Sequence, residues 1–408
     1  MQQARPRHVL DGYRVLDFTQ VLAGPAATRL LVEMGAEVIK VELPPTGDFS
    51  RNFPFLRDGR SGYYVQQNRG KKSFCVDVKR PEGLALTQEL IPKMDVVIEN
   101  FAPGAIARMG LSYDAVRRIN PRIIMCSISA FGQTGPLSAE PGYDFIAQAY
   151  AAVTHMIGDP DGAPSIPMLG LGDVTTGAHA VAAIVAALLH RERTGEGQYL
   201  DVSILDAYFH CHELNVQIYS NSKGAVKPKR SGTQHPQVCP TGVFRAPGGY
   251  LIIMAFLDHQ WRALCELMGC PELVQDSRFA TNTARLEHLG EVVARIEGWL
   301  ASMPSIEAAM AALSKVRVPN APVLSIEQAV NHPHHRARGT VRTIEDRFLG
   351  TFEVPGFPLR FSAYPDRLPL DAPVLGEHNA EVLSTYLGYD AGRIAALESG
   401  GVLGRVDR

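Results

Sequence analysis

The first 130 residues alternate between short runs of β-branched apolar residues and longer segments with helical spacing. We expect strands at residues 13–18, 37–43, 95–99 and 122–128, and helices at 25–34, 81–91 and 113–119. Alternation of this kind predicts βαβ units, in which helices cover both faces of a parallel sheet. Pro25 and Pro81 stand where two of the helices begin, the position at which a missing N–H costs least. The expected fold class is therefore α/β, with a Rossmann-like doubly wound parallel sheet.

A different pattern begins near residue 223, where the chain is rich in Gly, Pro and Lys. The segment TGVFRAPGGYLIIMAF then predicts a hairpin that turns at Gly248-Gly249. Helical segments follow at residues 259–268, 289–303 and 305–313. We therefore expect three parts. Residues 1–222 form the first part of a large Rossmann-like domain, residues 223–334 a smaller α+β domain, and residues 335–408 a linker and a return to the large domain.

The amino-acid composition argues against nucleic acids and membranes as binding partners. The 408 residues include 40 Lys and Arg against 42 Asp and Glu, so the chain has no surplus of positive charge for a nucleic acid or an anionic membrane. The most apolar stretch, residues 174–189, is shorter than the ~20 residues of a membrane span and is expected to be a buried helix. Six cysteines are too few for a disulfide scaffold, and the N-terminus shows no signal-peptide core. We expect a cytoplasmic protein with no nucleic-acid or membrane partner.

The usual cofactor and metal motifs are missing from the sequence. The segment FTQVLAGPAATRL after the first expected strand contains no G-x-G-x-x-G, and the chain has neither a P-loop nor a G-x-S-x-G elbow. His332, His334 and His335 lie in a polar turn without a nearby acidic or Cys ligand, and His210 and His212 are two residues apart. We expect no metal and no prosthetic group. A pocket at the carboxyl ends of the strands can still bind a nucleotide-like molecule without the usual glycine-rich diphosphate loop.

Asp173 is the strongest candidate for a residue that takes part in chemistry. It follows Gly170 and Gly172 and precedes a long helix of small residues. One interpretation is an N-cap, in which the carboxylate accepts a backbone N–H of its own helix. In the other, the glycines let a substrate approach the carboxylate, and the free N–H groups of the helix start stabilise an oxyanion. The residues alone leave both interpretations open.

Several motifs in one order identify a relationship. They are LDGYRVLDFTQVLAGPAATRLLVEMGAEVIKVE, NRGKKSFCVDVKRPEG, DVVIENFAPGAIARMGLSYD, GLGD, TGEGQYLDVSILDA and LGEHNAEVL. With them the chain resembles the family III CoA-transferases. This family includes formyl-CoA:oxalate, carnitine and succinyl-CoA:dicarboxylate CoA-transferases and, by divergence, α-methylacyl-CoA racemase. The resemblance implies an acyl-CoA and a small carboxylic acid as substrates, CoA thioester in place of any cofactor, and an interlocked homodimer.

The resemblance also implies roles for particular residues. Asp173 is the expected nucleophile, which forms a mixed anhydride and then an aspartyl-CoA thioester. The basic run is expected to meet CoA phosphates, because clustered cations favour them. Packing would explain the apolar contacts equally well, and a solvated surface the basic ones. The residues expected to contact CoA are Val21, Arg69, Lys71, Lys72, Val76, Asn100, Phe101, Ala105, Arg108 and Tyr143.

Departures from the family pattern bear on the substrate. Where formyl-CoA enzymes have a glycine-rich GGGGQ loop, this chain reads SGTQHPQVCPTGVF, which is closer to the succinyl-CoA:dicarboxylate enzymes. Leu43 also replaces a basic residue of the formyl-CoA type. Tyr143 stands where the racemase branch has His, and a two-base proton exchange needs a group on each face of the carbon.

The expected activity is therefore CoA transfer between an acyl-CoA, with succinyl-CoA as the candidate donor, and a carboxylic acid. The alternatives are an α-methylacyl-CoA racemase or epimerase, and a non-catalytic acyl-CoA binding protein. Four loop residues are candidates for holding a second carboxylate of the acceptor: Lys229, Arg230, His235 and Gln237.

Overall fold

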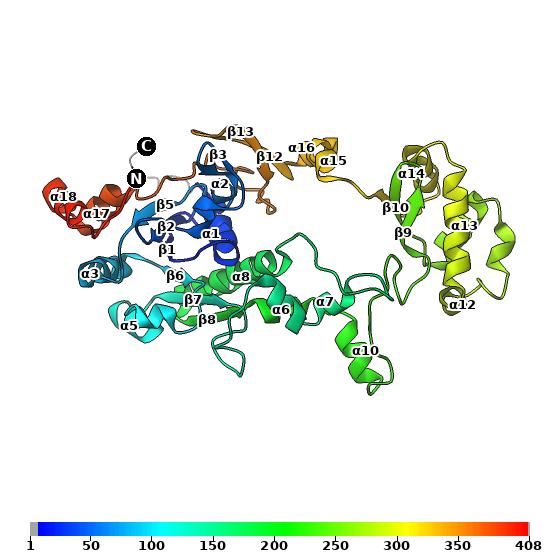
Figure 1. Ribbon diagram of the computed structural model, residues 1–408, viewed down its shortest axis with the longest axis horizontal. Helices are drawn as coiled ribbons and strands as arrows, with labels where there is room; N and C mark the ends of the chain where they lie inside the picture. Colours follow the sequence, from blue (N-terminus) through cyan, green and yellow to red (C-terminus); the bar gives the residue numbers. More distant parts are fainter. Residues whose placement is uncertain (1–6, 407–408) are drawn as a thin grey trace. The chain divides into compact units, whose positions relative to one another are not determined.

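The computed structural model describes residues 7–406, whose contacts divide the chain into two compact units (Figure 1). Among the described residues, the first unit comprises 7–153, 167–214 and 333–406, and the second comprises 154–166 and 215–332. The second unit thus contains most of the expected small domain and an additional segment from the middle of the chain. Arg230 explains that addition, because its guanidinium donates hydrogen bonds to the carbonyl oxygens of His155, Asp159 and Gly162.

A six-stranded parallel sheet forms the centre of the first unit (Figure 1). Its strand order is β5-β2-β1-β6-β7-β8, with every neighbouring pair parallel. Counted along the sheet-forming strands, this is the 3-2-1-4-5-6 order of doubly wound sheets. The prediction of a doubly wound α/β sheet is therefore confirmed. The strands are β1 (Arg14–Asp17), β2 (Glu37–Glu42), β5 (Lys72–Cys75), β6 (Val96–Glu99), β7 (Ile124–Ser129) and β8 (Tyr199–Ser203).

Helices cover both faces of this sheet. On one face, α1 (Ala23–Glu33) and α8 (Leu171–Thr194) share an apolar core with Val15 and Val38. On the other face, the neighbouring residues Leu16 and Ile39 belong to a second core. Because successive side chains of a strand point to opposite faces, the two cores lie on opposite sides of the sheet. The helices of the second core are α3 (Pro81–Leu90), α5 (Tyr113–Ile119), α17 (Asn379–Leu387) and α18 (Ala391–Ser399).

Helix α8 is long and apolar enough to cross a membrane, and it is the one helix among residues 7–406 that is. A core helix passes the same test. Thr176, Gly177, Ala180 and Ile184 of α8 are buried, and α8 packs closely along α1. A Cβ atom on Gly177 would lie only 2.9 Å from the carbonyl oxygen of Ala23, which explains why small residues are needed there. The predicted buried helix is confirmed for this face of α8.

Shorter elements complete the first unit. The two-stranded hairpins β3-β4 and β12-β13 are antiparallel. The remaining elements are β3 (Leu56–Arg57), β4 (Arg60–Ser61), α2 (Gly62–Asn68), α4 (Ala105–Arg108), α6 (Asp144–Tyr150), α9 (Ile204–His210), α16 (Pro333–Arg338), β12 (Val341–Asp346) and β13 (Gly350–Pro355), together with α7 (Val153–Met156) at the border between the units.

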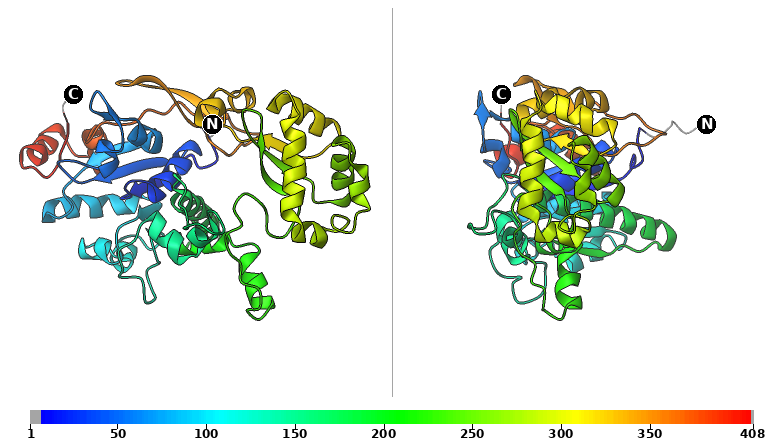
Figure 2. Two further views of the ribbon diagram at one scale, coloured as in Figure 1. Left: turned by 45° about the vertical axis from the view of Figure 1, so that its right-hand side comes forward. Right: turned by 90° about the vertical axis from the view of Figure 1, so that its right-hand side faces the viewer.

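The second unit has a core of its own, which includes the buried side chain of Trp261. The predicted hairpin is confirmed, with Gly248 in the left-handed region at its turn. Figure 2 shows the helix α13, in yellow, beside the antiparallel strands. The elements are α10 (Asn215–Asn221), β9 (Thr241–Ala246), β10 (Gly249–Met254), α11 (Asp258–Leu267), α12 (Asn282–Glu287), α13 (Leu289–Ala301), α14 (Ile306–Lys315), β11 (Asn320–Pro322) and α15 (Ile326–Asn331).

Candidate active site

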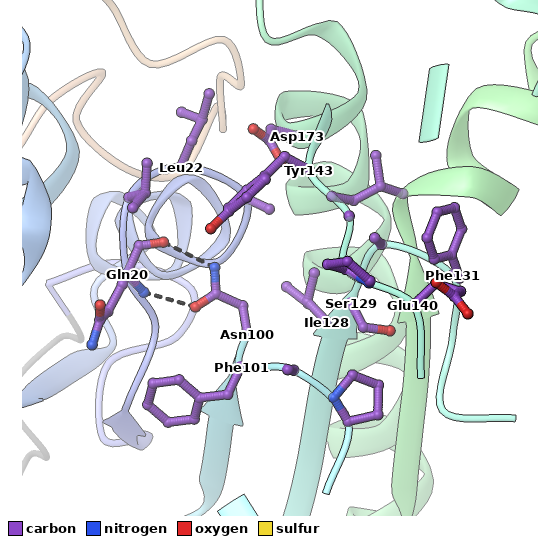
Figure 3. A pocket seen from close by; sticks show the side chains of 18 of the residues that line it. Gln20, Leu22, Asn100, Phe101, Ile128, Ser129, Phe131, Glu140, Tyr143 and Asp173 are labelled. Atoms are coloured by element: carbon purple, nitrogen blue, oxygen red, sulfur yellow. Dashed lines mark hydrogen bonds between the residues drawn. The ribbon is translucent and has the colours of Figure 1, made fainter. Parts of the chain in front are cut away.

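A cavity of about 680 Å³ opens at the carboxyl ends of β1, β6 and β7 (Figure 3). Its walls come from the loops after these strands and from the start of α8. Strand β1 pairs with β2 on one side and with β6 on the other, so the order in which successive strands are added to the sheet reverses at β1. Ligands of doubly wound sheets bind in the crevice at such a switch point. The cavity is therefore the candidate acyl-CoA site.

The loop after β1 enters the cavity in a strained conformation. Val21 has a φ of 65°, a left-handed value that is rare for a β-branched residue. Its N–H donates to Oδ1 of Asp48 at 3.2 Å. The N–H of Gln20 donates to Oδ1 of Asn100 at 2.7 Å, and Nδ2 of Asn100 donates back to the Gln20 carbonyl oxygen at 2.9 Å (Figure 3). Asn100 thus joins the loop after β6 to the loop after β1.

Below this loop lies a cluster of fully buried charges. Nζ of Lys40 is 2.8 Å from Oδ2 of Asp48 and donates to the Thr19 carbonyl oxygen at 2.6 Å. Nζ of Lys71 is 3.1 Å from Oδ2 of Asp17. Burial lowers the pKa of Lys71 to about 8, although Asp17 acts against this. The cluster fixes Asp48, and through it the Val21 loop, from inside the protein.

Asp173 lies in the first turn of α8, which begins after Gly170. Its backbone N–H donates to Oδ2 of Asp144 at 2.8 Å, so a side chain from α6 caps this helix. The Tyr208 hydroxyl donates to Oδ1 of Asp144 at 2.5 Å and accepts from Nε2 of Gln148 at 2.9 Å. Within residues 7–406, the carboxylate of Asp173 makes no hydrogen bond or ion pair, and it lines the cavity. The N-cap interpretation is therefore wrong, and the carboxylate is open to a substrate.

The surroundings also change the acidity of this carboxylate. Burial and, second, the charge of Asp144 raise the pKa of Asp173 to about 7. Burial raises the pKa of Tyr63 as well, and the negative charges of Asp173 and Asp48 add to that effect. Roughly half of the Asp173 side chains are thus protonated at pH 7, which differs from the ordinary ionised Asp. A poorly solvated carboxylate in a cavity is typical of a functional site.

We expect the formation of any covalent adduct on Asp173 to speed up as the pH rises through about 7. Only the ionised carboxylate attacks, and its pKa is raised, so the ionised fraction falls about tenfold per pH unit below that value. Rapid-mixing measurement of adduct formation between pH 5 and 9 tests this. Burial also raises the pKa of Glu99 to about 7, so Glu99→Gln is the matched control and should keep the same profile. A rate that is flat with pH would contradict the assignment.

Gly172 offers a second test of this arrangement. A Cβ atom there would lie 2.1 Å from Cε2 of Tyr208, so Gly172→Ala must displace the ring that holds Asp144. We expect the turnover of Gly172→Ala to fall by roughly tenfold or more, because small displacements of positioned groups are costly. Gly298→Ala in α13 is the control, since the space beside Gly298 is open. Circular dichroism should show both variants folded, and full activity of Gly172→Ala would contradict the expectation.

Five of the residues predicted for the site come together at this cavity. Val21, Asn100, Phe101 and Tyr143 line it with Asp173. Figure 3 shows Asp173 and Tyr143 where α8 begins and Phe101 near the strand ends. Tyr143 is 81% exposed and presents its ring to the opening. The predicted contacts Ala105 and Arg108 belong to the short helix α4, which follows the Phe101 loop without lining the cavity.

The basic run needs a correction. Arg69 and Lys71 are buried, and Lys72 is only about a quarter exposed. Each cation is paired inside the fold, which stabilises the first unit, and none of the three lines the active-site cavity. The structure therefore does not support their assignment to CoA phosphates. Their partners are Glu33 and the Gln66 carbonyl oxygen for Arg69, Asp17 and Asn68 for Lys71, and Glu37 and Glu381 for Lys72.

Val76 needs the same correction. Its side chain is fully buried in the core on the α3 face of the sheet, and its backbone bridges to Leu403. A residue without exposed surface cannot line a CoA groove in this conformation. Side chains along an extended chain alternate between the two faces of the sheet. Val76 directly follows β5, and this alternation turns its side chain into the core on the α3 face.

The sequence analysis missed the residues that hold Asp173. Asp144 was adjacent to the predicted Tyr143, and its acidic side chain before an apolar run was a signal of a helix start. Tyr208 and Gln148 lie on different helices and gave no signal, because contacts between distant segments follow from packing alone. Gln20 acts through its backbone N–H and carbonyl groups, which every residue type except Pro provides.

Comparison with known proteins identifies the family of the chain. The family model of CoA-transferase family III matches residues 10–379. A succinate–glutarate CoA-transferase of Agrobacterium fabrum is 39% identical, with 92% of this chain and 95% of the relative covered. The succinyl-CoA:glutarate CoA-transferase of Mus musculus is 37% identical over 97% of this chain and 90% of the relative. A crystal structure of a CaiB/BaiF family protein from Brucella suis is 34% identical and covers 93% of this chain and all of that chain, with a TM-score of 0.82. The chain therefore belongs to CoA-transferase family III, and it is a CoA-transferase that moves CoA between acyl-CoA thioesters and carboxylic acids.

Proposed function

We propose that Asp173 is the nucleophile of this transfer. The observation that carries the proposal is a cavity-lining carboxylate with no hydrogen-bond or ionic partner in the described chain, beside Asp144, which takes over the capping of α8. A carboxylate that neither caps its helix nor forms an ion pair is free to make a covalent bond. Covalent catalysis divides one difficult exchange into easier steps.

The steps balance without any further reagent. An Asp173 oxygen attacks the acyl carbonyl carbon, and the C–S bond breaks to give a mixed anhydride and CoA thiolate. The thiolate attacks the aspartyl carbonyl carbon, which releases the donor acid as its carboxylate and leaves an aspartyl-CoA thioester. The acceptor carboxylate attacks that thioester, which gives a new anhydride and thiolate. The thiolate finally attacks the acceptor acyl carbon, and Asp173 is regenerated.

The surroundings of the cavity fit a carboxylate nucleophile. Its lining residues include Glu140 and Asp173 but, within the described chain, no Lys, Arg or His. The pKa of Asp173 is accordingly raised and its negative charge poorly stabilised before reaction. Formation of a neutral anhydride removes that charge from the buried side chain. The ground state is thereby raised relative to the covalent intermediate.

We further infer that the donor is succinyl-CoA and the acceptor a short dicarboxylic acid. The two relatives that support this are named succinyl-CoA:glutarate CoA-transferase and succinate–glutarate CoA-transferase. The segment from Ser231 to Phe244 supports it too, because it lacks the glycine-rich loop of formyl-CoA enzymes. Lys229 and His235 stay predicted contacts of the second carboxylate. Arg230 is used otherwise, since it donates to three carbonyl groups of its own unit.

Trapping of the covalent intermediate tests the nucleophile. The protein is incubated with succinyl-CoA and no acceptor, and hydroxylamine is then added. We expect mass spectra to show a hydroxamate on the peptide that contains Asp173 and on no other peptide. Asp161→Asn, an exposed Asp of the 159–162 loop, serves as the matched control and should label normally. An unmodified Asp173 peptide in an active sample would refute the proposal.

A panel of acids tests the substrates. Succinyl-CoA, acetyl-CoA and formyl-CoA are each offered with glutarate, succinate, oxalate and acetate, and the new thioesters are measured by mass spectrometry. We expect the highest rates with succinyl-CoA and four- or five-carbon dicarboxylic acids. Incorporation of deuterium at the α-carbon in heavy water, without an acceptor acid, would instead identify a racemase.

We also propose that two chains form an interlocked homodimer in the cytoplasm. Large apolar side chains are exposed on α6 and α8, among them Phe145, Ile146, Val174 and Leu189. Such a patch is typical of an interface. The six cysteines are free, as in a reducing compartment. Light scattering should give twice the chain mass of 44.4 kDa, and cell fractionation should place the enzyme in the soluble fraction.

A further inference from the structure

A group of arginines surrounds one buried carboxylate of α1. The Glu33 side chain is fully buried, and its two oxygens accept hydrogen bonds from Arg69 and, at 2.9 Å, from Arg342. Nη1 of Arg29 lies 3.9 Å from the same carboxylate. Burial and the charge of Arg69 lower the pKa of Arg29 to about 10. One negative charge therefore faces three guanidinium groups.

Some donors of these guanidinium groups are left without an acceptor. Nε of Arg69 and both Nε and Nη1 of Arg29 are buried and have no hydrogen-bond partner among residues 7–406. The Arg69 side chain is 1% exposed. A buried donor without a partner costs about 1–3 kcal/mol, and more when it is charged. These buried donors do not reach a ligand themselves, but they leave positive charge uncompensated close to the exposed side chains of Arg338 and Arg367, which can contact an anion.

Two adjoining cavities open beside this group. Their volumes are about 380 and 310 Å³, and both are lined by Arg342, Thr343 and Arg367. Arg69 lines the first cavity. Arg338 and Arg367 are exposed and make no hydrogen bond or ion pair with the described residues. The other arginines of the second cavity are Arg336 and Arg360.

Nearby carboxylates do not neutralise this charge. Glu353 is paired with Arg336 at 2.7 Å and Asp366 with Arg360 at 3.2 Å. Glu345 and Asp371 line the first cavity and form no ion pair there. Seven arginines thus face five carboxylates, and the surplus of positive charge lies between the two cavities. The arginines are Arg29, Arg69, Arg336, Arg338, Arg342, Arg360 and Arg367, and the carboxylates are Glu33, Glu345, Glu353, Asp366 and Asp371.

We propose that this arginine site binds a small molecule that carries a diphosphate group. The planar guanidinium fork matches phosphate oxygens in a bidentate manner. Arg342 and Arg367 belong to both cavities, so one phosphoryl group in each cavity can share them. The two or three negative charges of a diphosphate offset the surplus. Each cavity lies in the lower range of small-molecule sites.

The arginine site is separate from the active site. No residue lines both the active-site cavity and either arginine-lined cavity. The bound group would connect Arg69, which directly follows α2, with the hairpin β12-β13 and the segment that follows it (Figure 1). A diphosphate here should therefore raise the unfolding temperature of the protein, because it binds only the folded state.

Calorimetric titration of the full chain tests this inference. Inorganic pyrophosphate and ADP are titrated at low salt without CoA, because CoA itself carries a diphosphate and would compete for the arginine site. We expect one saturable site per chain that weakens as salt is added. Equal affinity for the two probes assigns recognition to the diphosphate alone, and tighter binding of ADP adds a contact to the nucleoside.

Arg338→Gln with Arg367→Gln should weaken pyrophosphate binding at least tenfold and leave CoA transfer unchanged when no pyrophosphate is present. Both residues are exposed, so the double variant should fold. The matched control, Arg193→Gln with Arg262→Gln, removes two exposed arginines elsewhere and should bind like the wild type. The inference is overturned if pyrophosphate shows no saturable binding, if the double variant binds equally well, or if light scattering shows that this variant changes the number of chains in the particle.

Discussion

Replacement of Asp173 with alanine or asparagine should reduce CoA transfer by roughly three orders of magnitude or more, the effect seen when a covalent nucleophile is removed. The Asp173 carboxylate lines the cavity and makes no bond to the described chain. Its loss therefore removes the covalent step and no structural contact. Steady-state rates with succinyl-CoA and glutarate measure the effect.

Binding of CoA should survive in the same variants. The loops after β1 and β6 that line the cavity are held by Asn100 and Asp48, and neither residue contacts Asp173. Calorimetric titration with CoA should therefore give affinities within a few-fold of the wild type. Asp144→Asn is an informative companion, since it keeps the shape and reduces the charge beside Asp173. A variant at position 173 that transfers CoA at the normal rate would remove the basis of the mechanism.

Lys40→Ala should destabilise the first unit by about 3–5 kcal/mol, the range found when one partner of a buried ion pair is removed. Lys40 and Asp48 are both fully buried and 2.8 Å apart. Loss of the ammonium group leaves the Asp48 charge uncompensated and releases the Thr19 carbonyl oxygen. Burial raises the pKa of Asp48, and Lys40 opposes this effect and helps to hold the pKa at about 2, so loss of Lys40 removes the main group that stabilises the ionised carboxylate.

Chemical denaturation followed by circular dichroism measures this loss. The two tryptophans, Trp261 and Trp299, lie in the second unit, so their fluorescence gives an internal reference with a core of its own. Lys72→Ala is the matched control, because its ion pairs with Glu37 and Glu381 are partly exposed and worth about 1 kcal/mol or less. Equal destabilisation by the two substitutions would show that the buried cluster does not hold the fold.

The sheet was predictable wherever apolar runs are buried on both sides. The strands β1, β2, β6 and β7 and the helix α5 all follow from such runs or from helical spacing. The strand β8 was not predicted, because its sequence Tyr199–Ser203 includes polar residues at the edge of the sheet. Burial of an edge strand depends on its one neighbour, which the local sequence does not reveal.

The site was predictable at positions whose sequence motif carries the chemistry. Asp173, Val21, Asn100 and Phe101 were predicted from such motifs, and all four line the cavity. The basic run failed because charge does not determine where a side chain points. The buried ammonium group of Lys71 pairs with Asp17, which lies more than fifty residues earlier on β1, and β2 separates that strand from β5 in the sheet. Pairings of that kind arise from the fold and cannot be read from a local pattern.

The double hydrogen bond between Asn100 and the Gln20 backbone has a consequence for protein engineering. The Asn100 side-chain amide accepts one of these hydrogen bonds and donates the other, so Asn100→Asp or Asn100→Leu would break at least one of the two. The two loops should consequently shift together or not at all, and selection for new acids would gain little from varying them. Segment 131–143, where Phe131, Glu140 and Tyr143 also face the cavity, is the more adaptable wall and the better target for a library.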